Sequence, residues 1–514
     1  MAAIPDIGHR PSAPAPNGMA APEGRLREIA VCQILGLAAL AIIIYAVAGG
    51  KYRILPYAFA IPAALLIIPK PNLIPYAFIL SFFTFFTVYR EGWMLRILGV
   101  DVMFLIVFFA FLSRNRIDFR AALSEQSRLI AALVLFLLWA AVGWVVNFYS
   151  HGPLENISSV FFIFNIVQLI AAVILFSQPQ WKRYRDKILL FYMICIVFEI
   201  VAALGLEVLD GARSLSDFNR MSGTLGGHHG MLASVMILSF GIAAGAFFTL
   251  GGLVRKLFVL CVSIACIMTL FVAGSRGNLL GLILAMPVTV LLGYRLRSST
   301  LALVFLSMAA AFAIFWMSPL KGVVTGAMSA DTIDLSAYGR LLIWERVYEH
   351  AVSGPWLQKI TGIGIGTFNS LRFNYYLEVG MFTTGAHNNF MHTFVEVGIV
   401  GLIIYLAIFA EIIRRLTARS RRGDNAARCF LAATLALLFS CLTQETFWFN
   451  PSFGRFWMMY MICYLTLFNF RGEPGRENPV ACGAQHEHNH GCRVEAGSDT
   501  PARAAPGSAS GSTG

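Results

Sequence analysis

The chain contains few charged residues for its length. Charged side chains account for 13% of its 514 residues and hydrophobic side chains for 58%, whereas a soluble domain carries about 25% charged residues. This balance excludes a soluble globular protein and predicts an all-α, polytopic transmembrane helical bundle. Residues 1–25 are rich in Pro and Ala, and the apolar run after them is too long for the core of a signal peptide, so we expect no cleavable signal.

The sequence also lacks paired cysteines and the motifs that bind nucleotides. Its nine cysteines include no CxxC pair, which argues against a disulfide framework. Gly362, Gly364 and Gly366 alternate, but no Lys-Ser/Thr follows them and no strand is expected before them. We therefore interpret the run as a tight backbone turn against the membrane surface. We predict neither a bound metal nor a cofactor.

Long apolar runs indicate where the chain crosses the membrane. Runs of roughly 17–23 residues predict about fourteen spans, or about twelve if the second and fourth, which contain prolines and Asp101, do not cross. The expected spans are 29–48, 54–69, 71–89, 95–112, 129–148, 157–177, 187–208, 229–250, 253–273, 278–294, 299–318, 389–410, 427–446 and 453–470. One large polar loop interrupts this series, and we expect it to carry short helices.

Lys and Arg gather in alternate loops, and this asymmetry predicts which side of the membrane each loop faces. The basic residues are Arg114, Arg116, Arg120, Arg128, Lys182, Arg183, Arg185, Lys187, Arg255, Lys256, Arg295, Arg297, Arg414, Arg415, Arg419, Arg421 and Arg422. With fourteen spans all of them lie on one side, which we assign to the cytoplasm together with both termini. We expect a multi-pass protein of a bacterial inner membrane. Its net charge of +12 then reflects orientation and anionic lipids, with no nucleic-acid partner.

This topology divides the chain into five parts. They are a disordered cytoplasmic tail (1–25), transmembrane helices (26–318), a large periplasmic loop (319–388), further transmembrane helices (389–470) and a second disordered cytoplasmic tail (471–514). The composition of both tails is typical of disorder. His486, His488 and His490 alternate in the second tail, where metal binding is conceivable. We favour a solvated low-complexity segment.

Three arginines stand at membrane boundaries on the outward side, where positive charge is disfavoured. Arg220 precedes a predicted helix, Arg276 occupies a tight turn between two spans, and Arg340 opens an expected short amphipathic helix with Trp344 and Val347. An arginine near hydrocarbon is costly unless it is paired or faces a wet cavity. Snorkelling would explain any one of them. Three together favour a shared anionic ligand such as a pyrophosphate.

His387 lies at the outer rim, directly before another apolar helix. A histidine at such a place often caps the helix or makes a structural hydrogen bond. The alternative is a neutral imidazole that accepts a proton from a hydroxyl group. Asn388, Glu345 and the buried acid Glu396 are candidate supporting residues, together with Trp344. The weaker candidates are His228, His229 and His392.

Between residues 210 and 410 the sequence carries an ordered set of short motifs. They are Arg220 with Ser-Gly-Thr and Gly-Gly-His-His, Ser275-Arg276-Gly277, Gly339-Arg340 with Trp344, the run Gly362 to Phe368, and Ala386-His387-Asn388-Asn389-Phe390 with Val395-Glu396-Val397-Gly398. Together this set resembles the O-antigen ligase/polymerase superfamily. The first motif departs from that pattern, because it ends in His228-His229 where members often have Pro-Asn.

The resemblance implies a metal-independent, inverting membrane glycosyltransferase. Its donor would be an undecaprenyl-pyrophosphate-linked oligosaccharide at the outer face of the inner membrane. Arg220, Arg276 and Arg340 would hold the pyrophosphate, and His387 would take the proton of the acceptor hydroxyl. A flippase and a chain-length regulator of the same pathway would be partners, with the lipid bilayer as surroundings.

Three functions stay open at this level. The span count and the long tails favour a polymerase of exopolysaccharide or O-antigen. A ligase that transfers the glycan to lipid A core shares the same motifs. A transporter of a lipid-linked or anionic solute would also use intramembrane charges. Against it, we find no internal repeat, and the candidate residues gather on one face of the membrane.

Overall fold

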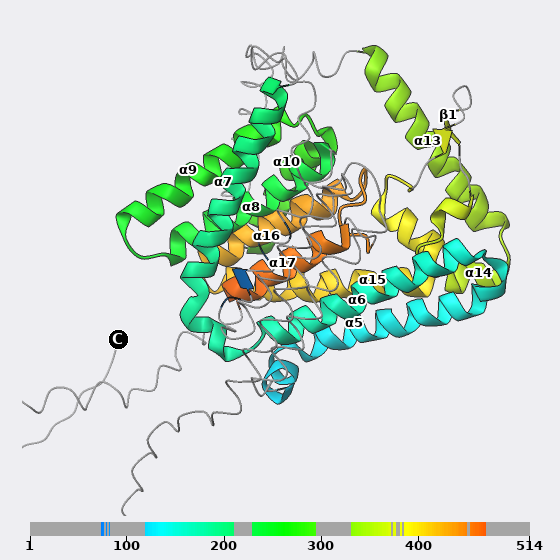
Figure 1. Cartoon of the computed structure of the whole chain (residues 1–514), viewed down its shortest axis with the longest axis horizontal. Helices are drawn as coiled ribbons and strands as arrows, with labels where there is room; N and C mark the ends of the chain where they lie inside the picture. Colours follow the sequence, from blue (N-terminus) through cyan, green and yellow to red (C-terminus); the bar gives the residue numbers. More distant parts are fainter. Residues whose placement is uncertain are drawn as a thin grey trace, which may run out of the picture. The chain divides into compact units, whose positions relative to one another are not determined.

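The computed structural model of this protein (Figure 1) describes part of the chain. The described residues are 73, 75, 76, 79, 82, 119–209, 229–293, 330–371, 374–376, 381–382, 385–449 and 453–468. The spans predicted at 29–48, 54–69, 95–112 and 299–318, most of the span at 71–89, and both tails lie outside the described residues.

Among the described residues, nine apolar helices coincide with nine of the predicted spans. They are α5 (Phe119–Asn147), α6 (Pro153–Phe176), α7 (Arg185–Leu209), α8 (His229–Thr249), α9 (Leu253–Val272), α10 (Arg276–Gly293), α15 (Asn389–Arg421), α16 (Asn425–Ser440) and α17 (Phe453–Phe468). Seven of them are long and apolar enough to cross a membrane, and α16 and α17 are shorter. The prediction of a polytopic helical membrane protein is confirmed.

The polar loop before α15 carries helices and a small hairpin. Its described elements are α13 (Ala330–Ser353), α14 (Trp356–Thr361), η6 (Phe368–Leu371) and the antiparallel strands β1 (Asn374–Tyr376) and β2 (Met381–Phe382). Arg340 lies inside α13, so the prediction that it opens a short helix is wrong. The sequence from Ala330 includes two aspartates, and acidic residues near a helix N-terminus favour the start of a helix there.

Small residues let α16 lie close to α8 and α10. A Cβ placed on Gly241 would lie 2.4 Å from the Ala433 Cβ, and one on Gly281 would lie 2.4 Å from the Ala436 carbonyl oxygen. Lipid tails are as apolar as leucine, so helices associate in a membrane through close packing of this kind. It also brings the segment after α16 beside the starts of α8 and α10.

The helices α5, α6 and α15 form a second packed group (Figure 1). α15 packs on α5, and α17 packs on α6. The aromatic ring of Phe136 from α5 lies 5.8 Å from that of Tyr405 and 5.3 Å from that of Phe449, between ring centroids. Buried aromatic pairs of this kind hold the α5–α6 pair against α15 and the segment after α16.

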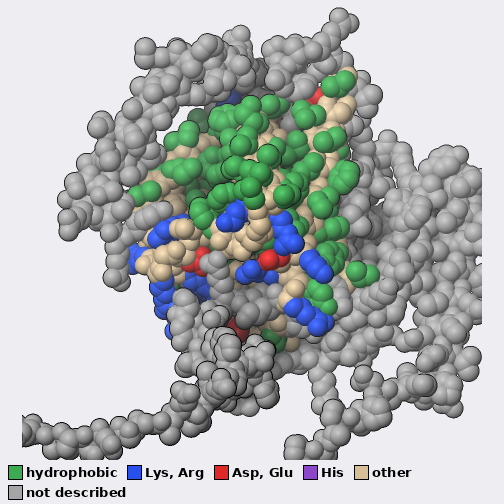
Figure 2. Space-filling view, turned by 90° about the vertical axis from the view of Figure 1, so that its left-hand side faces the viewer, with side chains coloured by type: hydrophobic (Ala, Val, Ile, Leu, Met, Phe, Trp, Pro, Cys, Tyr) green, Lys and Arg blue, Asp and Glu red, His purple; other side chains and the backbone are tan. Residues whose placement is uncertain are grey.

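Basic residues gather at one end of this helix group. Arg415 Nη1 donates to Glu125 O near the start of α5 (2.9 Å), and Arg421 Nε donates to Leu292 O at the end of α10 (2.8 Å). Figure 2 shows Lys and Arg side chains along the edge of a hydrophobic band. α15 starts at the His387 motif and ends at these arginines, so the two lie at opposite ends of α15. Which end faces the cytoplasm stays a prediction.

Candidate active site

An asparagine cap starts α15 directly after His387. Asn388 Oδ1 accepts hydrogen bonds from Phe390 N (3.0 Å) and Met391 N (3.1 Å). A side chain in this position satisfies backbone N–H groups that have no partner within the helix. Asn388 therefore fixes where the helix begins, and with it the position of the preceding His387.

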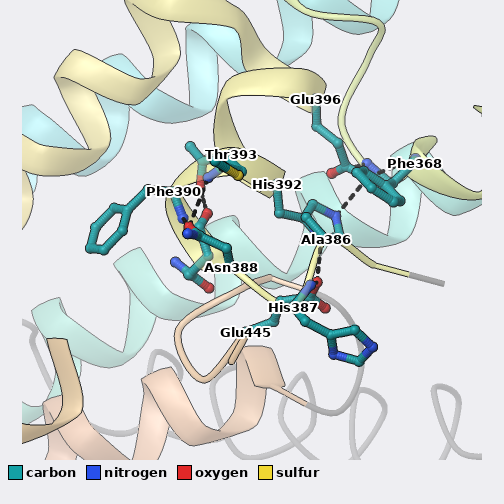
Figure 3. A network of polar contacts seen from close by, with 12 residues as sticks. Phe368, Ala386, His387, Asn388, Phe390, His392, Thr393, Glu396 and Glu445 are labelled. Atoms are coloured by element: carbon teal, nitrogen blue, oxygen red, sulfur yellow. Dashed lines mark hydrogen bonds and ion pairs between the residues drawn. The ribbon is translucent and has the colours of Figure 1, made fainter. Parts of the chain in front are cut away.

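His387 has a left-handed backbone with φ 48°, and no other non-glycine residue among those described has a positive φ. This conformation costs about 1–2 kcal/mol for a residue with a Cβ, and strained residues of this kind cluster at functional sites. The His387 N–H donates to Glu445 Oε1 (2.7 Å). Figure 3 shows the His387 imidazole turned away from the buried His392 ring. The His387 backbone is thus held by the Glu445 carboxylate, while the His387 side chain points away from His392.

His392 lies buried between two acids, and we call His392, Glu396 and Glu445 the acid–histidine cluster. The His392 Nδ1 lies 3.0 Å from Glu445 Oε1, and its Nε2 lies 3.2 Å from Glu396 Oε1. Burial raises the pKa of the Glu445 carboxyl, but His392 and the contact with His387 outweigh burial and hold that pKa below its ordinary value. Glu445 is therefore a carboxylate at neutral pH.

Glu396 joins this cluster to the glycine turn, residues 362–368. Its Oε2 accepts from Gly366 N (2.7 Å), and its Oε1 accepts from Phe368 N (2.9 Å). The φ angles of Gly362, Gly364 and Gly366 are 74°, 110° and 77°, a region that glycine adopts without steric cost. The predicted tight turn is present, but it is buried against α15, whereas we expected it against the membrane surface.

α15 is interrupted at Gly398, where φ is 69° and ψ is −175°. The interruption leaves carbonyl groups without a helical partner, and in hydrocarbon each such group would cost several kcal/mol. Three bonds from other segments take their place: Ile363 N to Val395 O at 2.9 Å, Gly364 N to Glu396 O at 3.0 Å, and Trp139 Nε1 to Val397 O at 2.9 Å. The glycine turn and α5 therefore stabilise a broken helix beside the acid–histidine cluster.

The loop helix α13 contacts the same motif. Trp344 Nε1 donates to Ala386 O (2.9 Å), immediately before His387. Arg340 lies one turn before Trp344 and is half-buried, and its Nε is buried with no hydrogen-bond partner among the described residues. Glu345 is exposed and stands apart from the buried cluster. The helix α13 therefore contacts the His387 motif through Trp344, and Arg340 lies one helical turn from that contact.

Arg276 is the first residue of α10 and adjoins polar residues around Gln444. Gln444 Nε2 donates to Ser275 Oγ (2.6 Å), and Asn278 Nδ2 donates to Gln444 Oε1 (3.1 Å). Because Gln444 directly precedes Glu445, the start of α10 is attached to the same segment that contacts the two histidines. Arg276 thus belongs to the same end of the structure as His387.

Two further candidates lie outside the described residues: Arg220 and His228. Sequence reasoning gave no role to Glu445, because it lies within the predicted span 427–446. In the structure α16 ends at Ser440, so Glu445 lies in the connection to α17. The available signal was the polar pair Gln444-Glu445 at the end of an apolar run, which a hydropathy count absorbs into the span.

These observations define a multi-pass helical membrane protein with a polar site at one end of its longest described helix. Residues 261–406 match the family model described as O-antigen ligase. This match supports the resemblance to the O-antigen ligase/polymerase superfamily over residues 261–406. The matched segment includes Arg276, Arg340 and His387, whereas Arg220 and Glu445 lie outside it. No curated protein matches the chain.

Proposed function

We propose that this protein is a membrane glycosyltransferase that polymerises undecaprenyl-pyrophosphate-linked repeat units into exopolysaccharide or O-antigen on the periplasmic face. The observation that carries the proposal is His387, held in a left-handed conformation directly after Ala386, the residue that Trp344 of the Arg340 helix contacts. The family match supports an enzyme of the glycosyltransferase type. The substrate and the face of the membrane are our proposal.

In this reaction His387 is the general base. Its neutral imidazole takes the proton from the acceptor hydroxyl while that oxygen attacks the anomeric carbon of the donor. The bond from this carbon to the pyrophosphate oxygen breaks, and attack from the opposite face inverts the configuration. The pyrophosphate leaves on its lipid, and the proton leaves His387 for solvent.

Arginines stabilise the charge that develops on the leaving group. Arg340 and Arg276 belong to the same end of the structure as His387, and we assign them with Arg220 to the pyrophosphate. Guanidinium groups bind phosphate oxygens through paired N–H donors. Fixed donors aimed at developing charge stabilise the transition state more than the ground state. Arginines in this role supply the positive charge without a metal ion.

The donor must arrive already activated, because nucleotide sugars are absent outside the cytoplasm. We therefore propose a flippase as the source of the lipid-linked unit and a chain-length regulator as a second partner. One alternative is an O-antigen ligase that transfers a finished glycan to lipid A core; the matched family model is described as O-antigen ligase. A transporter is disfavoured, since the candidate residues gather at one end of α15.

The test is the glycan profile of cells that lack this protein, complemented with wild type, His387→Ala, Arg340→Lys or His350→Ala at equal membrane abundance. His350 is a half-buried histidine of α13 away from the His387 motif, so His350→Ala is the matched control. Arg340→Lys keeps the charge and loses the two-pronged donor. We expect long polymer from wild type and control, and single lipid-linked units from the other two.

Each outcome separates the alternatives. Long chains that stay on the lipid carrier in the absence of the protein would identify a ligase. Full complementation by His387→Ala would refute the catalytic assignment and favour transport or scaffolding. Loss of polymer in His350→Ala as well would show that substitution in this region acts through the fold.

A further inference from the structure

The acid–histidine cluster contains one base and two acids in direct contact. The side chains of His392, Glu396 and Glu445 are 4%, 1% and 11% exposed. Buried charges are stable only when they are paired and hydrogen-bonded. The protonation state of each side chain in this cluster therefore depends on the contacts that it makes with the other two and with nearby backbone N–H groups.

Both acids accept hydrogen bonds from backbone N–H groups. Glu396 accepts from two backbone N–H groups, of Gly366 and Phe368, and Glu445 accepts from the N–H of His387. The contacts of Glu445 with His392 and His387 hold its pKa below the ordinary value and keep it charged. A neutral imidazole can donate from only one nitrogen, whereas an imidazolium donates from both. The two His392 nitrogens lie at ion-pair distance from Glu445 (3.0 Å) and Glu396 (3.2 Å), so a doubly protonated ring would face each acid with an N–H.

Aromatic rings line the faces of the same imidazole. Phe368 stacks on His392 with ring centroids 4.5 Å apart, and the Trp448 ring lies at 5.0 Å. A cation over an aromatic face is stabilised by the ring quadrupole. The ring thus has acidic side chains at its two nitrogens and an aromatic ring stacked on one face, and these surroundings suit a cation.

We propose that His392 is a permanent imidazolium that acts with Glu445 as a positioning device for His387. The charged ring holds the Glu445 carboxylate, and the same oxygen, Oε1, receives the His387 N–H. The other ring nitrogen contacts Glu396, which accepts a hydrogen bond from Gly366 N in the glycine turn. His392 and Glu445 are positioning residues, and neither takes the substrate proton. The consequence for catalysis rests on the proposed function; the charge on His392 does not.

The charge is measured directly by solid-state NMR of the full-length protein in lipid vesicles. His392 is the one histidine of the ten that follows a methionine, so ¹³C-carbonyl Met with ¹⁵N-His labelling assigns it in the wild type. We expect both ring nitrogens of His392 to carry protons from about pH 6 to pH 8.5, a range over which a free histidine, with a pKa of about 6.5, loses one proton. An unprotonated ring nitrogen on His392 at pH 7 would overturn the proposal.

The positioning role is tested with Glu445→Gln and Glu445→Asp in purified enzyme. The donor probe is the lipid-linked oligosaccharide extracted from cells that lack the protein. Glutamine still accepts the His387 N–H but removes one negative charge from His392, and aspartate keeps the charge on a shorter side chain. We expect kcat to fall by about 10–100-fold in Glu445→Gln, because small displacements of a catalytic group have effects of this size. KM should stay unchanged, and Glu445→Asp should recover part of kcat.

Several results separate this inference from the proposed function. A raised KM with normal kcat in Glu445→Gln would refute positioning of His387. A kcat loss matched by equal loss of folded protein on size exclusion, in both variants, would refute it too. A doubly protonated His392 in a protein that is inactive on every glycan donor would uphold the charge and refute the glycosyltransferase.

Discussion

The break in α15 at Gly398 should not tolerate a side chain. A Cβ on Gly398 would lie 2.0 Å from the carbonyl oxygen of Ile360 and 2.7 Å from Gly362 N. Its φ of 69° and ψ of −175° fall in a region that is essentially restricted to glycine and costs other residues about 1–3 kcal/mol. Relief of the overlap adds about 1–3 kcal/mol. Gly398→Ala should therefore lose roughly 2–6 kcal/mol of the 5–15 kcal/mol typical of native proteins.

The assay is thermal unfolding of purified protein in detergent, followed by tryptophan fluorescence. The matched control is Gly205→Ala in α7, because a Cβ on Gly205 meets nothing within 4 Å. Alanine is favoured over glycine inside a helix by about 1 kcal/mol, so the control should melt at or above the wild-type temperature. A Gly398→Ala protein that melts with the wild type would show that α15 does not need this interruption, and the reasoning on the broken helix would be refuted.

Two further predictions concern residues around His387. Asn388→Ala should lower stability by about 0.5–2 kcal/mol through loss of the helix cap, whereas Asn388→Asp should retain most of it; thermal unfolding of both variants checks this, and equal losses would contradict a capping role. The lowered pKa of Glu445 makes its stabilising effect present at neutral pH and lost as pH falls below the ordinary value of 4.5. The difference in melting temperature between wild type and Glu445→Gln should therefore be larger at pH 7 than at pH 4, and a constant difference would contradict it.

Much of the membrane architecture could be predicted from the sequence. The nine described apolar helices were expected at their observed places, because a membrane helix must be about 20 apolar residues long and must satisfy its own backbone. The boundaries were less accurate where local signals were weak. α13 begins at Ala330, well before Arg340, since its polar first turns show no apolar run. α16 ends at Ser440, because hydropathy does not register a change of backbone direction among apolar residues.

Some residues of the candidate site could likewise be predicted from the sequence, and others could not. His387, Arg276 and Arg340 were selected from the sequence because polar residues at the ends of apolar runs are unusual and stand in recognisable motifs. The glycine turn was also legible, since positive φ is a local property of the chain. Asn388 was expected only as a supporting residue, and its role as the helix cap came from the structure. Charge, hydropathy and local backbone preference are thus read from residues close together along the chain.

The sequence by itself determined the helical membrane fold, the order of the motifs and the identity of His387 as the principal candidate. Only the tertiary structure placed Glu445 against His387 and His392, and Glu396 against the glycine turn. Fifty-eight residues separate His387 from Glu445, and their contact depends on how closely α16 packs against α8 and α10. Such contacts arise from the packing of whole helices in three dimensions, which no local pattern along the chain encodes.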